Sequence, residues 1–179
     1  MNLARLILRA VVGGYFFGHG TQKLFGWFGG HGPEGTGQFF ESLGLRPGKR
    51  HALAAGAAES GGGSLVLLGA ATPLAASVLI ATMLTAIKRV HLPNGPWVSN
   101  GGYEYNLVLI AALLALAETG PGSPSVDSAL GSNLKGNKAV LLAAILGTAG
   151  AVGAHYVAES APAPEPAPAP ETDAAPAAA

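Results

Sequence analysis

Apolar residues fall in five runs along the chain, each separated from the next by a polar or glycine- and proline-rich segment. A run of about 20 apolar residues is long enough to cross the hydrocarbon core of a bilayer as a helix. The pattern therefore predicts an all-α integral membrane helical bundle with a four-helix core and a fifth transmembrane helix. The expected spans are residues 4–28, 51–71, 74–90, 103–118 and 138–157.

The segments between these runs complete the expected organisation. Residues 36–45 predict a short amphipathic helix at the membrane surface, because their large apolar side chains fall on one side. The short connection at Thr72-Pro73 predicts an antiparallel hairpin of the second and third spans. From residue 158 an Ala/Pro/Glu repeat predicts a disordered tail. The expected domains are a four-helix membrane domain at 1–130, a polar linker with the fifth helix at 131–157, and the tail at 158–179.

Composition supports a membrane protein and excludes several kinds of chemistry. Only 11% of the 179 residues are charged, whereas a soluble domain usually has about 25%. The absence of cysteine excludes disulfides, thiolate nucleophiles and cysteine-bound iron–sulfur clusters. A formal net charge of zero and the lack of a basic stripe argue against nucleic acid as a partner. The first run has no convincing cleavage site, so we expect a retained span rather than a signal peptide.

Ionisable residues inside the expected spans are costly in a membrane and are the candidate functional groups. At about 1.5 Å rise per residue, His19 lies roughly 12 Å from the Trp27 end of the first span, and Glu59 lies at a similar depth in the second. Lys23, Lys88 and Glu104 fall in the same half of the membrane. We therefore predict that Glu59 pairs with Lys23 or His19, and that Lys88 pairs with Glu104. The opposite half is expected to be nearly featureless.

Each of these groups also has a purely structural interpretation. The two ion pairs could simply fix helix packing, because charges on one face show coupling and not chemistry. Tyr15, one turn before His19, is more often a core aromatic residue than a ligand contact. No histidine has a ligand-spaced partner, so no metal site is expected. Glycines are expected to allow close helix contact, and these structural candidates are Gly14, Gly18, Gly62 and Gly63.

Several motifs, in order, resemble the DoxX family of small bacterial membrane proteins. These motifs are HGTQKLFGW at 19–27, AAESGGGSLVLLG at 57–69, MLTAIKRVH at 83–91 and YEYNLVLIAALLALAETGPGSPSVD at 103–127. The resemblance implies a four-helix membrane bundle related to a subunit of thiosulfate:quinone oxidoreductase. Some relatives are linked to membrane-associated redox complexes. The residues that match the family pattern are His19, Gly20, Lys23, Glu59, Gly62, Gly63, Glu104 and Asp127.

Two readings of function follow. In the first, which the resemblance favours, the protein belongs to a membrane oxidoreductase system and binds a quinone or small substrate among spans one to four. His19, Lys23, Glu59, Glu104 and Lys88 are then the ligand-binding or proton-relay candidates. In the second, the protein is a non-enzymatic scaffold, chaperone or small-solute carrier, and the same charges lock the bundle.

The resemblance also implies a setting for the protein. We expect a multi-pass protein of the bacterial inner membrane with a cytoplasmic N-terminus, which puts the polar cluster toward the outer leaflet. No covalent cofactor is expected, and a quinone is the candidate bound one. The expected partners are the lipid bilayer, redox subunits and further copies of the chain. Relatives tend to carry a basic residue before the serine of GPGSPSVD (120–127), so a contact made there is in doubt.

Overall fold

The protein folds as an all-α bundle, as predicted. The structure is a computed structural model, and it describes residues 2–132 and 134–161. Within these residues there is no strand, and a π-helical turn at Ile87–His91 continues α4. The helices are α1 (Leu3–Phe25), α2 (Gly32–Ser42), α3 (Gly48–Leu68), α4 (Thr72–Ala86), α5 (Glu104–Thr119), α6 (Val126–Ala129) and α7 (Asn137–Glu159).

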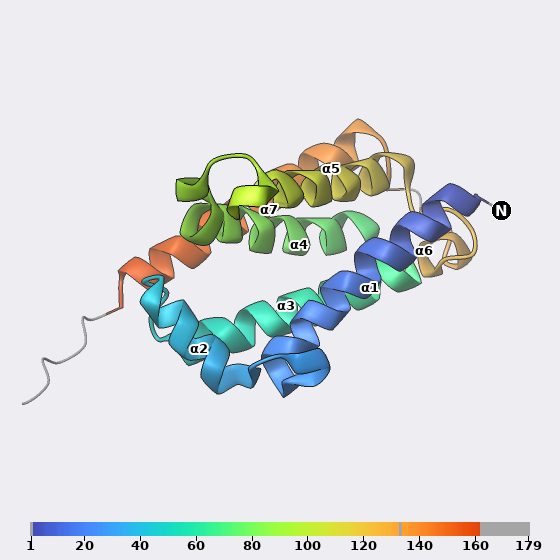
Figure 1. Ribbon diagram of the computed structural model, residues 1–179. Coiled ribbons are helices and arrows are strands. Elements are labelled where there is room, and N and C mark those ends of the chain that lie inside the picture. The colour runs from blue at the N-terminus through green and yellow to red at the C-terminus, as the bar shows by residue number, and fades with distance from the viewer. Residues whose placement is uncertain (1, 133, 162–179) are drawn as a thin grey trace, which may run out of the picture.

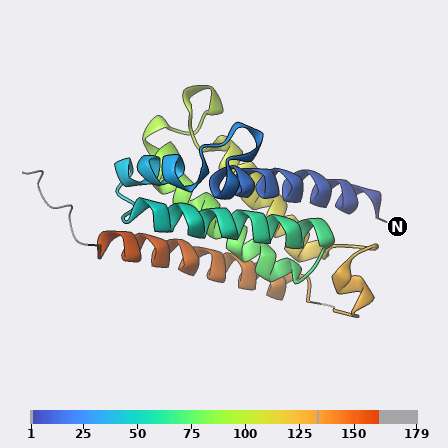
Figure 2. The ribbon, with the colours of Figure 1, turned by 90° about the horizontal axis from the view of Figure 1, so that it is seen from below.

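The helices form two layers that diverge. Figure 1 shows α1, α2 and α3 in one layer and α4, α5 and α7 in the other. The layers meet near the N-terminus and α6, and they separate toward α2. The most extensive contacts join α1 with α3 and α4 with α7. Seen from below in Figure 2, α6 lies at the N-terminal end of the bundle and α2 at the other. We call these the closed end and the open end.

Glycine allows α1 and α3 to touch backbone to backbone. A Cβ atom on Gly13 would lie 2.7 Å from the carbonyl oxygen of Gly63, and one on Gly63 would lie 2.5 Å from the backbone nitrogen of Phe17. A Cβ atom on Gly62 would lie 2.8 Å from Leu79 of α4. The predicted close packing at Gly62 and Gly63 is therefore observed, and a larger residue at either position would push helices apart.

The expected contact at Gly14 and Gly18 is wrong. Neither glycine has a neighbouring atom within 4 Å of an added Cβ. The buried stripe of α1 contains Gly13, Phe16 and Gly20 instead, so the helix is rotated by about one residue from the expected contact face. Gly14 and Gly18 form a small-residue pair, but it faces away from α3 and contributes nothing to the contact.

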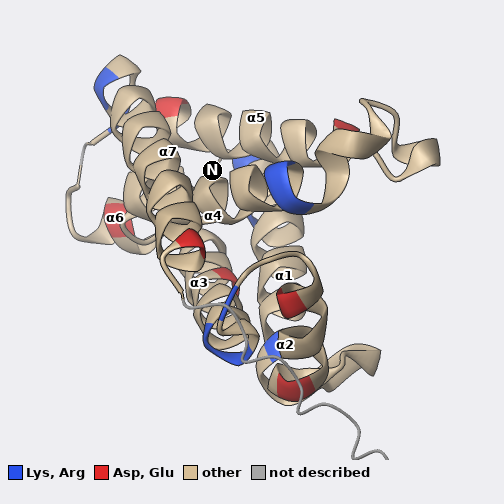
Figure 3. Ribbon diagram, turned by 90° about the vertical axis from the view of Figure 1, so that its left-hand side faces the viewer, with Lys and Arg blue, Asp and Glu red and all other residues tan. Residues whose placement is uncertain are grey.

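The surface of the bundle is apolar, as expected for contact with lipid. Large hydrophobic side chains are exposed along the helices, including Ile7, Val11, Val108, Ile145 and Val152. Figure 3 shows that most of the ribbon is uncharged. A soluble protein rarely exposes so large an apolar area. The exposed side chains thus have the distribution of a membrane protein.

Within the described residues, two helices are long and apolar enough to cross a membrane, judged by length and composition alone: Thr72–Asn94 and Asn137–Glu159. With 23 and 21 residues, α1 and α3 are about 35 and 32 Å long, which also suffices for a ~30 Å core. Polar residues and glycines lower their hydropathy. The shorter α5 has 16 residues and is about 24 Å long. Crossing by all five helices, and the division into domains, remain predictions.

Helix boundaries differ from the sequence prediction by a few residues at several ends. The first helix stops at Phe25 rather than residue 28, and α3 covers Gly48–Leu68 rather than 51–71. The short helix α2 starts at Gly32 rather than residue 36, because Pro33 occupies its first turn, where its fixed φ angle suits a helix start. The fifth helix continues to Glu159, two residues beyond its predicted end. Most of the predicted disordered tail, residues 162–179, lies outside the described residues.

Candidate functional site

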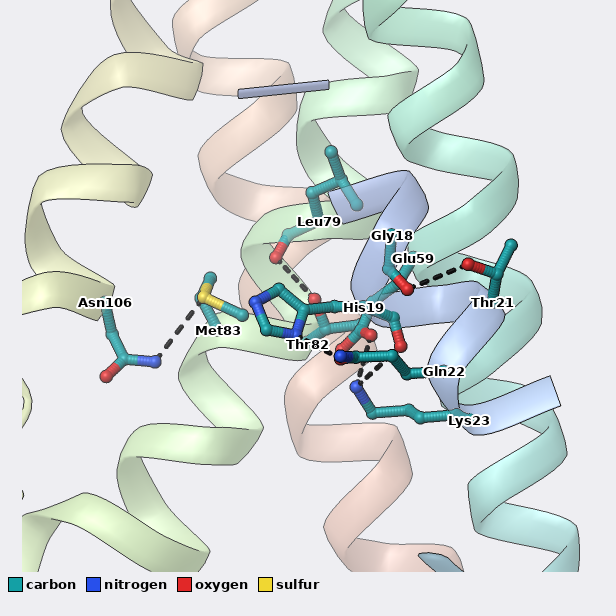
Figure 4. Close-up of polar contacts among 10 residues, drawn as sticks. All are labelled: Gly18, His19, Thr21, Gln22, Lys23, Glu59, Leu79, Thr82, Met83 and Asn106. Atoms are coloured by element: carbon teal, nitrogen blue, oxygen red, sulfur yellow. Dashed lines mark hydrogen bonds and ion pairs between the residues drawn. The ribbon is translucent and has the colours of Figure 1, made fainter. Parts of the chain in front are cut away.

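Lys23 and Glu59 form an ion pair between α1 and α3. The Nζ atom of Lys23 lies 2.5 Å from Oε2 of Glu59, and it also donates to the backbone oxygen of His19 at 3.3 Å. The side chains of Glu59 and Lys23 are 8% and 20% exposed. Glu59 was expected to pair with Lys23 or His19, and the pairing with Lys23 is confirmed. Figure 4 shows this contact together with the neighbouring polar groups.

His19 is held beside the pair but does not contact Glu59. Its Nδ1 atom donates to Oε1 of Gln22 at 2.9 Å, since an amide oxygen can only accept. The amide nitrogen of Gln22 donates in turn to the backbone oxygen of Phe28 at 3.3 Å, which fixes the orientation of the amide. This arrangement leaves Nε2 of His19 available to a ligand.

These groups line a cavity of about 670 Å³ between the two layers. Its lining residues come from both layers, and most of its wall is apolar. Ligand pockets typically have volumes of about 300–1,000 Å³ and apolar walls with a few polar groups. Phe39 and Phe40 of α2 belong to the wall, as does Leu146 of α7. The predicted fifth helix therefore contributes to the cavity.

Two of the predicted site residues lie elsewhere. Lys88 and Glu104 do not line the cavity, and no ion pair joins them within residues 2–132 and 134–161. Both side chains are exposed, and Glu104 accepts a hydrogen bond from the backbone nitrogen of Val98 at 2.9 Å. The predicted Lys88–Glu104 pair is thus wrong. The π-helical turn after Ala86 changes the direction of the side chains that follow, which an unbroken α-helix would not do.

Arg89 occupies the inward position that was expected for Lys88. It lines the cavity, and its Nε atom donates to Nδ1 of His155 at 3.0 Å. Its Nη2 atom lies 3.2 Å from Oε1 of Glu159. Both partners belong to α7, so α7 positions a cation at the wall of the cavity.

Asn106 is a second polar residue that the sequence analysis missed. It is 6% exposed, lies in α5 and lines the cavity. Its amide nitrogen donates to Sδ of Met83 at 3.4 Å, as Figure 4 shows. The signal was available in the sequence. Asn106 is the one strongly polar side chain in the otherwise apolar run at residues 105–117.

The closed end contains a polar cluster where a featureless half was expected. Arg9 is 4% exposed and donates to the backbone oxygens of Val66, Leu67, Pro121 and Pro124 at 2.6–3.2 Å. That expectation is wrong because Arg9 turns inward to the carbonyls at the end of α3 instead of lying at the membrane edge. Two of these acceptors, Pro121 and Pro124, belong to the GPGSPSVD segment, where relatives tend to carry a basic residue.

Asp127 completes this cluster at the start of α4. Its carboxylate accepts from the backbone nitrogens of Ala71 and Thr72 at 2.7 and 3.0 Å, and from the Thr72 hydroxyl at 2.7 Å. A carboxylate at a helix N-terminus satisfies unpaired N–H groups and complements the helix dipole. Asp127 therefore fixes the α3–α4 hairpin, and three of its roughly four acceptor sites are used within the fold.

Metal binding finds no support in the described part of the chain, where no three His, Asp or Glu side chains are gathered closely enough to hold an ion. The ionisable residues of the cavity are dispersed over different helices.

Comparison with known proteins gives a family. A family model named DoxX matches residues 4–92, which include both Lys23 and Glu59. The chain is 37% identical over 115 residues to a Bacillus subtilis (strain 168) protein named "Putative oxidoreductase CatD", an alignment that covers 64% of this chain and 79% of that protein. No solved structure matches significantly. The chain belongs to the DoxX family.

Proposed function

We propose that this protein is a multi-pass inner-membrane component of an oxidoreductase system, and that it binds a quinone or a similar small oxygen-bearing ring compound in the cavity. The observation that carries the proposal is the position of the Lys23–Glu59 pair in the wall of an apolar cavity of about 670 Å³. A pair that only fixed helix packing would not need to face an open volume.

The residues fit the chemistry of such a ligand. Lys23 can donate a hydrogen bond to a carbonyl oxygen, whereas Glu59 and Nε2 of His19 can accept one from a hydroxyl group. The apolar remainder of the wall suits an aromatic ring and an alkyl tail. A bound quinone would supply reversible uptake of electrons and protons, and the protein groups would bind and orient it. The name of the Bacillus subtilis relative supports a redox setting.

Ligand titration of the purified full-length protein tests this function. The probe is a p-benzoquinone with a short alkyl chain, and binding is measured by isothermal titration in detergent. The double variant Lys23→Met/Glu59→Leu should weaken binding at least tenfold, because charge-assisted hydrogen bonds to the ligand are lost. A matched control is Lys49→Met/Glu34→Leu, since this pair joins α2 and α3 but is exposed and lies outside the cavity lining.

Three outcomes decide between the two functional readings. Loss of binding in the cavity variant with less than a twofold change in the control supports the proposal. Equal binding in both variants refutes the assignment of the site. No binding by the unaltered protein refutes quinone binding and favours a scaffold or carrier whose charges fix the bundle.

The membrane topology has its own test, which the absence of native cysteine makes clean. We propose a cytoplasmic N-terminus and five crossings. His31→Cys, at an exposed residue before α2, should react with a membrane-impermeant maleimide added to intact cells. Ser132→Cys, between α6 and α7, should react only after permeabilisation. The reverse pattern would invert the orientation, and labelling of both from outside would remove one crossing.

A further inference from the structure

Asn106 is a buried amide whose hydrogen-bonding capacity is mostly unused. Only 6% of the residue is exposed. Within residues 2–132 and 134–161 its side chain makes a single hydrogen bond, from the amide nitrogen to the Met83 sulfur at 3.4 Å. A thioether is a weak acceptor. The amide oxygen accepts no hydrogen bond from these residues. Unlike the Ser60 hydroxyl oxygen, however, it is not completely buried.

This amide is oriented for contact with a ligand. Asn106 lines the cavity, and Figure 4 shows its amide directed from α5 at Met83 on α4. Leaving a buried polar group without full hydrogen bonding is destabilising, and leucine at this position would avoid that cost in an apolar helix. A polar residue that holds a membrane bundle together would bond to a strong acceptor on the neighbouring helix. Asn106 finds only sulfur there, so a role in packing alone does not account for it.

The cavity therefore has polar groups on both of its layers. Lys23 and Glu59 lie on α1 and α3 and provide a donor and an acceptor. Asn106 lies on α5, in the other layer, and provides both in one carboxamide. Much of the wall around them is apolar. A ligand that used both groups would carry one oxygen atom near each layer and an apolar ring between them.

We propose that Asn106 is the second polar anchor of this cavity, and that the ligand is a ring compound with oxygen atoms at two opposite positions, the class of the p-quinones and their quinols. The carboxamide suits both members of this class. Its N–H group donates to a quinone carbonyl, and its oxygen accepts from a quinol hydroxyl. The Met83 sulfur is a weak competitor for the same N–H group. This inference rests on the proposed function of the cavity.

The experiment compares a two-ended and a one-ended probe. The two-ended probe is the short-chain alkyl p-benzoquinone, and the one-ended probe is a p-alkylphenol with the same chain. Asn106→Leu removes the amide but keeps the approximate volume. We expect it to weaken quinone binding about five- to tenfold, as for the loss of one hydrogen bond. Binding of the phenol should change less than twofold, because its single oxygen uses the stronger Lys23–Glu59 end.

The variant must remain folded for this comparison, and its melting temperature and gel-filtration profile check this. Removal of a poorly paired amide should leave the melting temperature unchanged or raise it. Asn106→Ser is the second variant, because its short hydroxyl can bond back to its own helix but not reach across the cavity. It should reproduce the loss of quinone binding. Val108→Leu, on the exposed side of the same helix and outside the cavity lining, is the control for substitution in α5 and should bind both probes like the unaltered protein.

The outcomes separate failure of this inference from failure of the proposed function. If Asn106→Leu binds the quinone as tightly as the unaltered protein while Lys23→Met/Glu59→Leu does not, the second anchor is refuted and the proposed function stands. If Asn106→Leu weakens both probes equally, the residue acts through cavity shape and the two-ended ligand is refuted. If the unaltered protein binds no quinone, both proposals fall together.

Discussion

The two ends of the bundle each bury a cation and a carboxylate, but they use them differently. At the closed end Arg9 donates to four backbone oxygens, and Asp127 accepts three hydrogen bonds at the start of α4. At the open end Lys23 and Glu59 bond mainly to each other, beside a cavity. Buried charged groups that hydrogen-bond mainly to the backbone stabilise the fold. Charged groups that face a cavity and have unused hydrogen-bonding capacity are available to a ligand.

The largest effect should come from the closed end. Arg9→Leu leaves several buried carbonyls without a donor, and the cost should be about 3–5 kcal/mol of unfolding free energy. Arg5→Leu is the control, because Arg5 donates to the oxygens of Thr119 and Gly120 from a more exposed position. It should cost about 1 kcal/mol. Thermal unfolding in detergent measures both, and equal effects would contradict the special role of Arg9.

The contact between α1 and α3 should show the next largest effect. Gly13→Leu would place a side chain against the backbone of Gly63 and should destabilise the protein by about 3 kcal/mol, since overpacking forces the helices apart. Gly14→Leu is a control one residue away, where an added Cβ meets nothing within 4 Å. It should leave the melting temperature nearly unchanged.

Gly14→Leu also tests whether further copies of the chain, which are expected as partners, pack on this side of α1. Gly14 and Gly18 form a small-residue pair on the side of α1 away from α3. If a second copy packs there, Gly14→Leu should reduce the assembled mass measured by light scattering. An unchanged mass would mean that this face contacts only lipid.

The open end should respond differently to single and double substitution. Lys23→Met leaves the Glu59 carboxylate buried without its cation and should cost about 2 kcal/mol, less than for a fully buried pair because Lys23 is 20% exposed. Lys23→Met/Glu59→Leu removes both charges and should return stability to within about 1 kcal/mol of the original. Chemical unfolding in detergent measures the difference. A double variant as unstable as the single one would show that the pair chiefly holds the fold, as at the closed end.

The sequence predicted those features that depend on short-range regularity. Runs of apolar residues placed the helices, and the constant rise of a helix put Glu59 level with His19 and in the same half as Lys23, its partner in the structure. Features that depend on rotation about a helix axis were not predicted. A shift of one residue separates Gly14 from the contact face. After the π-helical turn, Arg89 rather than Lys88 lines the cavity.

Long-range contacts between side chains and backbone groups could not be predicted from the sequence either. The partners of Arg9 are carbonyl oxygens from segments 57 to 115 residues away, and every residue type carries such an oxygen. No side-chain pattern identifies them. Asn106 is a different case, because a lone amide in an apolar run is visible in the sequence and its significance depends on the cavity that it faces.

The smallest effect should come from Lys88 and Glu104, which look like a second ion pair in the sequence but not in the structure. Lys88→Ala should change stability by less than about 0.5 kcal/mol, because the side chain is exposed. Glu104→Ala should cost about 1 kcal/mol, because Glu104 accepts from the Val98 backbone in the first turn of α5. The two costs should add, since residues without shared partners are energetically independent. A coupling energy above about 1 kcal/mol in the double-mutant cycle would show that the pair forms in the membrane, and the open end would then contain two ion pairs instead of one.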